Sequence, residues 1–127
     1  MFTVDKLSRT PIYEQLIRQF EYRILSGDIP ANGLLPSVRS LSLELGINPN
    51  TLQRAYCEIE KRGLCYSVAG SGRYLTANAM ERIKEQALAK IDEFRSSVIS
   101  LKEHGVPEET ILDIIKQVYE ERKAVEV

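Results

Sequence analysis

Glycine and proline divide residues 35–63 into two short amphipathic segments, and no other feature constrains the fold of this chain so strongly. Ser37 can accept a hydrogen bond at the start of the first segment, and Gly46 can end that segment in the left-handed conformation. Asn48 supplies a second cap before a proline, which predicts a second helix over residues 49–61. Two helices joined by a turn of about three residues predict a helix-turn-helix.

The segments on either side of this helix pair add a third helix and a hairpin. Thr10 and Pro11 predict the start of a helix over residues 11–26, because apolar residues recur there at helical spacing. After the pair, two β-favouring segments, 64–68 and 73–76, flank a run of small residues. This order predicts a short hairpin with an exposed tip, in the position of a wing behind the helix-turn-helix.

From residue 77 onward the apolar residues follow a heptad-like spacing along a predicted helix of 77–103. Pro107 opens a last helix, so we expect an antiparallel pair. These 51 residues cannot enclose a core by themselves, and a second copy of the chain is the simplest partner. We therefore predict a winged-helix domain over residues 1–76 and a dimerisation region over 77–127. The predicted dimerisation residues are Ile83, Ala87, Ile91, Phe94, Val98, Leu101, Ile111 and Ile115.

The composition argues against several classes of function. Two cysteines and one histidine are too few for a disulfide framework or a zinc site. A catalytic triad would depend on His104, which lies in an apparent loop, and the sequence has no glycine-rich phosphate loop. We therefore predict no enzyme activity, no metal and no cofactor. The sequence also shows no apolar run of about 20 residues and no signal-peptide pattern, which predicts a cytoplasmic protein without a membrane partner.

The distribution of charge is more informative than the net charge of −1. Residues 1–76 carry nine Lys and Arg against seven Asp and Glu, whereas residues 77–127 carry eight against eleven. The basic excess therefore belongs to the predicted winged helix, and binding to phosphate depends on where the charges lie. A helix-turn-helix places the start of its second helix in the major groove, where Arg can pair with guanine and Asn or Gln with adenine.

These rules predict an interface for double-stranded DNA built from three segments. The first turns of the second helix would contact bases, Arg39 would contact the phosphate backbone, and the wing tip would approach a groove closely. The predicted DNA-binding residues are Arg39, Asn50, Thr51, Gln53, Arg54, Ser71, Gly72 and Arg73. A winged helix that binds another protein is the alternative, because the basic excess of residues 1–76 is small.

The remaining aromatic and cysteine residues allow structural interpretations. Tyr56 shares the apolar face of its predicted helix, so we expect it in the core. The hairpin residues Tyr66 and Tyr74 could pack in the core or stack on unpaired bases, and the sequence does not decide between these roles. Cys57 and Cys65 are expected to be small buried apolar residues.

Several ordered motifs together resemble the winged-helix domain of the GntR family of bacterial transcription regulators. They are Pro11-Ile12-Tyr13-Glu14-Gln15-Leu16, Leu35-Pro36-Ser37-Val38-Arg39, Leu45-Gly46-Ile47-Asn48-Pro49-Asn50-Thr51 and Gly70-Ser71-Gly72. The short tail is similar to that of the YtrA subfamily. This resemblance implies a mainly α fold with a small β-hairpin, and a homodimeric repressor that binds an inverted-repeat operator, often that of an ABC transporter operon. It matches Arg39, Thr51 and Gly72 to family positions and leaves any small-molecule effector unidentified.

Overall fold

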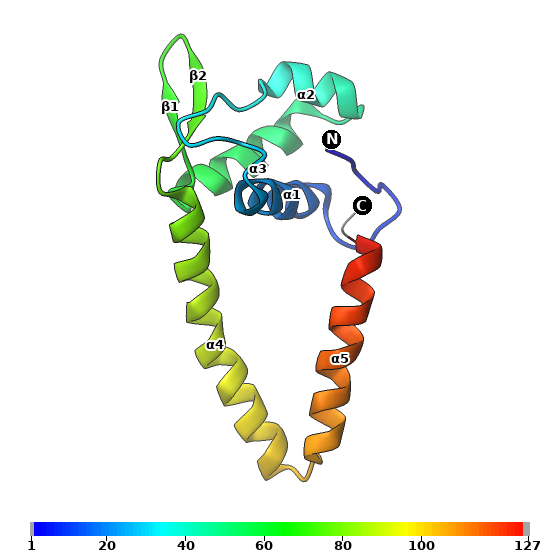
Figure 1. Cartoon of the computed structure of the whole chain (residues 1–127). Coiled ribbons are helices and arrows are strands. Elements are labelled where there is room, and N and C mark those ends of the chain that lie inside the picture. The colour runs from blue at the N-terminus through cyan, green and yellow to red at the C-terminus, as the bar shows by residue number, and fades with distance from the viewer. Residues whose placement is uncertain (1, 126–127) are drawn as a thin grey trace. The chain divides into compact units, whose positions relative to one another are not determined.

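The computed structural model of the chain describes residues 2–125, and side chains up to residue 121. Within that range it has five α-helices and one two-stranded antiparallel sheet, so the predicted mainly α fold with a small hairpin is confirmed (Figure 1). The elements are α1 (Ile12–Ser26), α2 (Val38–Leu45), α3 (Pro49–Lys61), β1 (Cys65–Val68), β2 (Gly72–Leu75), α4 (Ala79–Glu103) and α5 (Glu108–Val125). The chain forms two compact units, one up to Glu85 and one from Gln86 onward.

The helix-turn-helix has the caps that the sequence predicts. The Ser37 side chain accepts a hydrogen bond from the backbone N–H of Ser40 at 3.1 Å, and Gly46 ends α2 with φ of 65°. The Asn48 side chain accepts from the N–H of Asn50 at 2.8 Å, and Pro49 occupies the first turn of α3. Each cap satisfies a backbone donor that the first turn of a helix leaves unpaired, which determines where α2 and α3 begin.

The start of α1 differs slightly from the prediction. Pro11, rather than Thr10, is the N-cap residue, and its carbonyl accepts from the N–H groups of Glu14 and Gln15. The carbonyl of Thr10 instead accepts a hydrogen bond from the Gln15 side chain at 2.8 Å. The helix therefore begins one residue later, at Ile12, and the segment before α1 is held by side chains of the helix itself.

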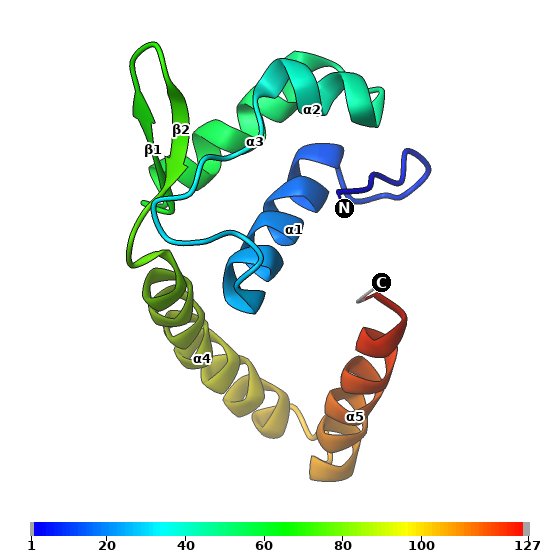
Figure 2. The same ribbon diagram turned by 45° about the horizontal axis from the view of Figure 1, so that its top comes forward.

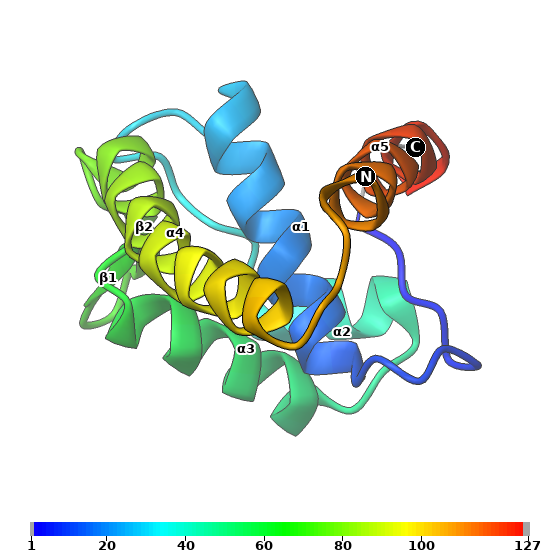
Figure 3. The same ribbon diagram turned by 90° about the horizontal axis from the view of Figure 1, so that it is seen from below.

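The core of the first unit lies where α1 crosses α3, and α2 packs against α3 on another side (Figure 3). Three aromatic rings extend through it, because Phe20 of α1 lies 4.6 Å from Phe2 and 5.1 Å from Tyr56, centroid to centroid. The other fully buried large side chains are Leu16, Ile24, Leu52, Ile59 and Leu64. The core location predicted for Tyr56 is confirmed.

The segment between α1 and α2 pairs with the outer edge of β2, beside the two strands of the hairpin. The N–H of Leu35 donates to the carbonyl of Arg73 at 2.9 Å, and the N–H of Leu75 donates to the carbonyl of Gly33 at 2.8 Å. An isolated bridge joins Leu34 to Tyr74. Figure 2 shows this segment passing beside β2 on its way to α2. The wing is thus supported on one edge by backbone hydrogen bonds.

The two units differ in how many of their side chains are buried. The first turns of α4 belong to the first unit, where Ala79 and Ile83 are 1% and 6% exposed. Of the side chains described from residue 84 to residue 121, none is buried within the single chain. Large apolar side chains of both tail helices are open to solvent. They are Leu88, Ile91, Phe94, Ile99, Leu101, Leu112, Ile114, Val118 and Tyr119.

Candidate nucleic-acid interface

The outer face of α3 presents polar side chains to solvent from its first turns. Leu52, Ala55 and the other buried residues of α3 face the core, so the residues between them along the helix point away from the core. Asn50, Gln53 and Arg54 are exposed, and Thr51 is half-buried. The structure therefore brings the predicted base-contacting residues together on one helix end, with donors and acceptors suited to base edges.

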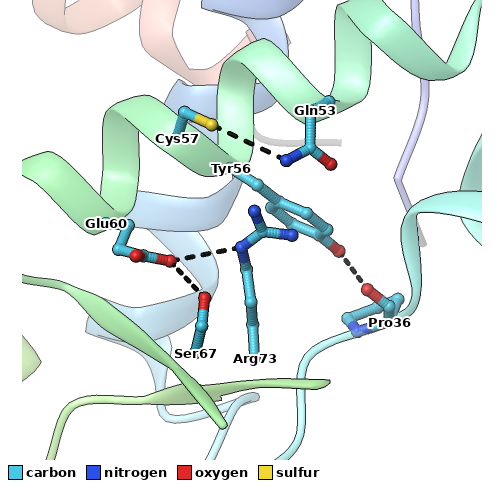
Figure 4. A network of polar contacts seen from close by, with 7 residues as sticks. All are labelled: Pro36, Gln53, Tyr56, Cys57, Glu60, Ser67 and Arg73. Carbon is cyan, nitrogen blue, oxygen red and sulfur yellow. Dashed lines mark hydrogen bonds and ion pairs between the residues drawn. The ribbon is translucent and has the colours of Figure 1, made fainter. Parts of the chain in front are cut away.

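Cys57 lies on the same outer face, one turn after Gln53. Its thiol is exposed, and the Gln53 amide donates to the sulfur at 3.7 Å (Figure 4). The prediction that Cys57 is buried is wrong, because its position on the helix points away from the residues that pack on α1. Cys65 in β1 is buried as predicted.

Arg54 makes an aromatic contact that the sequence does not reveal. Its guanidinium lies over the ring of Tyr13 in α1, with the central carbon 3.7 Å from the ring centroid. Stacking occupies the planar face of the guanidinium and leaves its N–H edge available to other acceptors. The pairing depends on the way α1 crosses α3.

The wing tip combines small residues with positive backbone angles. Gly70 and Gly72 have φ values of 76° and 126°, and the N–H of Ser71 donates to the carbonyl of Val68 at 3.0 Å. A side chain at Gly72 would be strained by that angle and would also meet Leu34 at 3.2 Å. Ser71 and Gly72 are both exposed, as an approach to a groove requires.

The hairpin tyrosines pack on each other. The rings of Tyr66 and Tyr74 are stacked with centroids 5.9 Å apart, and their hydroxyl groups hydrogen-bond to Asn32 and Ser71. The two tyrosines therefore pack as a pair on the wing and not in the core, and Tyr66 remains 40% exposed.

Arg73 does not extend from the wing into solvent. Its Nε donates to Glu60 of α3 at 3.3 Å, its guanidinium lies 5.2 Å from the centroid of the Tyr56 ring, and its side chain is only 20% exposed (Figure 4). This placement differs from the predicted DNA contact. Successive side chains of β2 point to opposite faces of the hairpin, and the side chain of Arg73 is on the face toward α3. We leave Arg73 out of the interface proposed below.

Two basic residues lie near the helix-turn-helix. Arg39 is exposed in the first turn of α2. The Lys6 ammonium donates to the carbonyl of Gly46, in the turn between α2 and α3, at 2.9 Å. The sequence gives no signal for this contact of Lys6, because no periodic pattern indicates that the segment before α1 packs beside this turn.

The predicted dimerisation residues are unequal in their exposure. Ile91, Phe94 and Leu101 are between 41% and 53% exposed, and Ala87 is also exposed. Three others are half-buried, namely Val98, Ile111 and Ile115. Ile83 is the exception, because it completes the core of the first unit and is not available at the surface of the chain.

Two buried groups titrate above neutral pH. Burial raises the pKa of the Tyr56 hydroxyl well above 10.0, and the charge of Arg73 opposes this with a smaller effect. Burial raises the pKa of the Cys65 thiol to about 11, and the Glu60 carboxylate acts in the same direction. Both groups are therefore protonated at neutral pH.

Residues 2–125 offer neither a metal-binding cluster nor a membrane-spanning helix. That part of the chain contains no group of three or more acidic, histidine or cysteine side chains placed to hold a metal ion. None of its helices combines the length and the apolar character needed to cross a bilayer. The exposed polar face of α3 therefore remains the strongest candidate site.

A helix-turn-helix with an exposed second helix and a two-stranded wing defines a winged-helix DNA-binding protein. Residues 12–75 match the family model described as "Bacterial regulatory proteins, gntR family". The chain belongs to the GntR family and is a transcriptional regulator with an N-terminal DNA-binding domain.

Relatives and solved structures agree with this assignment. The chain is 35% identical to the HTH-type transcriptional repressor YtrA of Bacillus subtilis (strain 168), over 93% of this chain and 92% of that protein. A GntR family transcriptional regulator from Listeria monocytogenes superposes with a TM-score of 0.65 at 31% identity, covering 90% of this chain and 98% of that one. The DNA-binding domain of AraR in complex with operator ORX1 gives 0.54 at 25% identity, covering 60% and 96%. The predicted family and YtrA-like character are confirmed, and these relatives are regulators rather than enzymes.

Proposed function

We propose that the chain is a homodimeric repressor that binds an inverted-repeat operator through α3 and the wing tip. The single observation that carries this proposal is the cluster of Asn50, Gln53 and Arg54 on the solvent face of α3, beside Thr51. Arg39 would contact a phosphate from α2, and Ser71 and Gly72 would enter the neighbouring groove. The structure of the similar AraR DNA-binding domain in complex with an operator supports operator binding by this domain.

Dimerisation is proposed from the exposed apolar side chains of α4 and α5. The described tail buries none of its side chains from residue 84 to residue 121, and exposed apolar faces of this size mark association surfaces. A symmetric pair would present two copies of α3 to half-sites about 34 Å apart, one turn of DNA. Ile91, Phe94, Val98, Leu101, Ile111 and Ile115, with Ala87, would form the interface.

The likeness to the repressor YtrA supports repression as the mode of action. The resemblance to the short-tailed subfamily supports an operon of the ABC transporter type as the target, and a cytoplasmic location follows from DNA binding. No small-molecule effector is part of this proposal.

DNase I footprinting on the region upstream of the chain's own gene tests the proposal. We expect protection of two inverted half-sites about one helical turn apart, and at least a hundredfold preference for this duplex over a scrambled one at physiological salt. Arg39→Ala should weaken binding to both duplexes and flatten the salt dependence by about one unit per contact in each subunit. Equal binding to operator and scrambled DNA by the intact wild-type protein would refute sequence-specific repression and would favour the protein-binding alternative.

A further inference from the structure

One carboxylate oxygen of α3 accepts polar contacts from both strands of the wing. Glu60 Oε1 accepts from Ser67 Oγ of β1 at 2.7 Å and from Arg73 Nε of β2 at 3.3 Å (Figure 4). Ser67 and Arg73 are also direct partners in the antiparallel register of the hairpin. A single side chain of α3 therefore contacts both strands of the wing at the same level.

The Arg73 guanidinium is held from a second side by the core. It lies 5.2 Å from the centroid of the Tyr56 ring, and the Tyr56 hydroxyl donates to the carbonyl of Pro36, just before α2. Tyr56 is itself 1% exposed. The contacts of Arg73 thus connect the wing to the fully buried part of the helix-turn-helix rather than to solvent.

The contact of Glu60 with Ser67 and Arg73 lies close to the wing tip, so it can affect where the tip is placed. Ser71 lies two residues before Arg73, which corresponds to about 7 Å along an extended strand. A small rotation of the hairpin about the level of Ser67 and Arg73 would displace the tip relative to the outer face of α3. If both surfaces meet one duplex, their relative placement decides whether they can do so together.

We propose that Glu60 is a positioning residue for DNA binding, and that Arg73 acts through Glu60 instead of contacting phosphate. This inference rests on the proposed function, because it assumes that α3 and the wing tip bind the same operator. If Arg73 contacted phosphate, the Glu60 carboxylate beside it would weaken its attraction for the DNA and would itself repel the DNA. The two roles of Arg73 therefore predict opposite effects of neutralising Glu60.

Glu60→Gln provides the test, with Glu58→Gln as its matched control. Glu58 also lies on α3, is paired with an arginine at 3.1 Å, and has a side chain 34% exposed compared with 40% for Glu60. Both variants remove one negative charge from the same helix. If Glu60 positions the wing, Glu60→Gln should bind operator about three- to tenfold more weakly than Glu58→Gln, because a charge-assisted contact becomes a neutral one. The salt dependence should equal that of Glu58→Gln.

Two further variants separate positioning from charge. Ser67→Ala leaves the charge unchanged and should weaken operator binding by about two- to fivefold. The double variant Glu60→Gln with Arg73→Gln should bind no more weakly than Arg73→Gln alone, because the two residues act as one unit.

Hydroxyl-radical footprints of the Glu60→Gln complex should show reduced protection at the DNA contacted by the wing, with unchanged protection beneath α3. Circular dichroism melts would verify that each variant is folded at the assay temperature.

The failures can be told apart. If Glu60→Gln binds operator as well as Glu58→Gln, the positioning role is overturned. If Glu60→Gln binds more tightly, the positioning role is overturned and a phosphate contact by Arg73 is favoured. If the wild-type protein itself fails to distinguish operator from scrambled duplex, the proposed function is overturned before any variant is compared.

Discussion

Replacing Phe94 by alanine tests the proposal that the tail forms a dimer. Phe94 lies on α4 and is 53% exposed in the single chain. An aromatic side chain offers about 200 Å² of surface, so roughly 100 Å² remains to be buried by a partner. At about 25 cal/mol per Å² this contributes up to about 2.5 kcal/mol per copy, and a symmetric dimer contains two copies.

The expected loss for the dimer is therefore about 3–5 kcal/mol, since alanine retains part of the contact. That loss corresponds to a dimer dissociation constant raised by about a hundredfold or more. Sedimentation equilibrium over a concentration series measures this constant directly. Operator affinity should fall with it, because each α3 would then bind its half-site without the effective concentration supplied by its partner.

Leu43→Ala is the matched control for Phe94→Ala. Leu43 is a large apolar residue of α2, outside the tail, and is 76% exposed. Its replacement should leave the dissociation constant unchanged. An unchanged constant in Phe94→Ala, or a wild-type protein that sediments as a monomer at micromolar concentration, would contradict the dimer proposed here.

Three further predictions follow from individual contacts. Tyr13→Leu should reduce the preference for operator over scrambled DNA by about two- to fivefold in competition anisotropy, because it removes the ring under Arg54. Tyr13→Phe keeps that ring and should retain the preference. An equal loss of preference in both variants would exclude the ring as the cause. N-ethylmaleimide should modify the exposed Cys57 in the free protein, and bound operator should slow that reaction measured by mass spectrometry; an unchanged rate would mean that this face of α3 does not meet DNA. The contribution of Cys65 to the free energy of unfolding should be fully present below about pH 8 and should fall by about 2–3 kcal/mol by pH 11, because the unfolded chain loses the Cys65 proton at lower pH than the folded one. Tyr56 should steepen the fall above pH 10. Urea titrations should show a smaller fall for Cys65→Ala below pH 10, and the same fall in both proteins would reject this explanation.

Local signals in the sequence were sufficient for most of the secondary structure. Ser37, Gly46 and Asn48 determine the limits of α2 and α3 through hydrogen bonds and backbone angles within a few residues, so the sequence is enough to predict them. The apolar period likewise identified Tyr56 as a core residue. The exposed placement of Asn50, Gln53 and Arg54 follows from the same helical geometry.

Contacts between distant segments could not be predicted in this way. The pairing of Leu35 with Arg73 carries no periodic signal, because it joins an irregular segment to the edge of a hairpin. The contact of Lys6 with Gly46 spans 40 residues, and the stacking of Arg54 on Tyr13 needs the crossing of α1 over α3. Side chains of this kind find partners only after the elements have packed.

The amino-acid sequence is sufficient to predict the helices, the hairpin and the inward-facing apolar residues, because these depend on local hydrogen bonding and on periodicity, and its ordered motifs indicate the family. Three features emerge only when the elements pack together: Ile83 closes the core of the first unit, Cys57 is exposed, and Arg73 turns toward Glu60 instead of toward solvent. The physical reason is that a charge or a small apolar side chain can be accommodated at many surfaces, and its surroundings are set by segments far away along the chain.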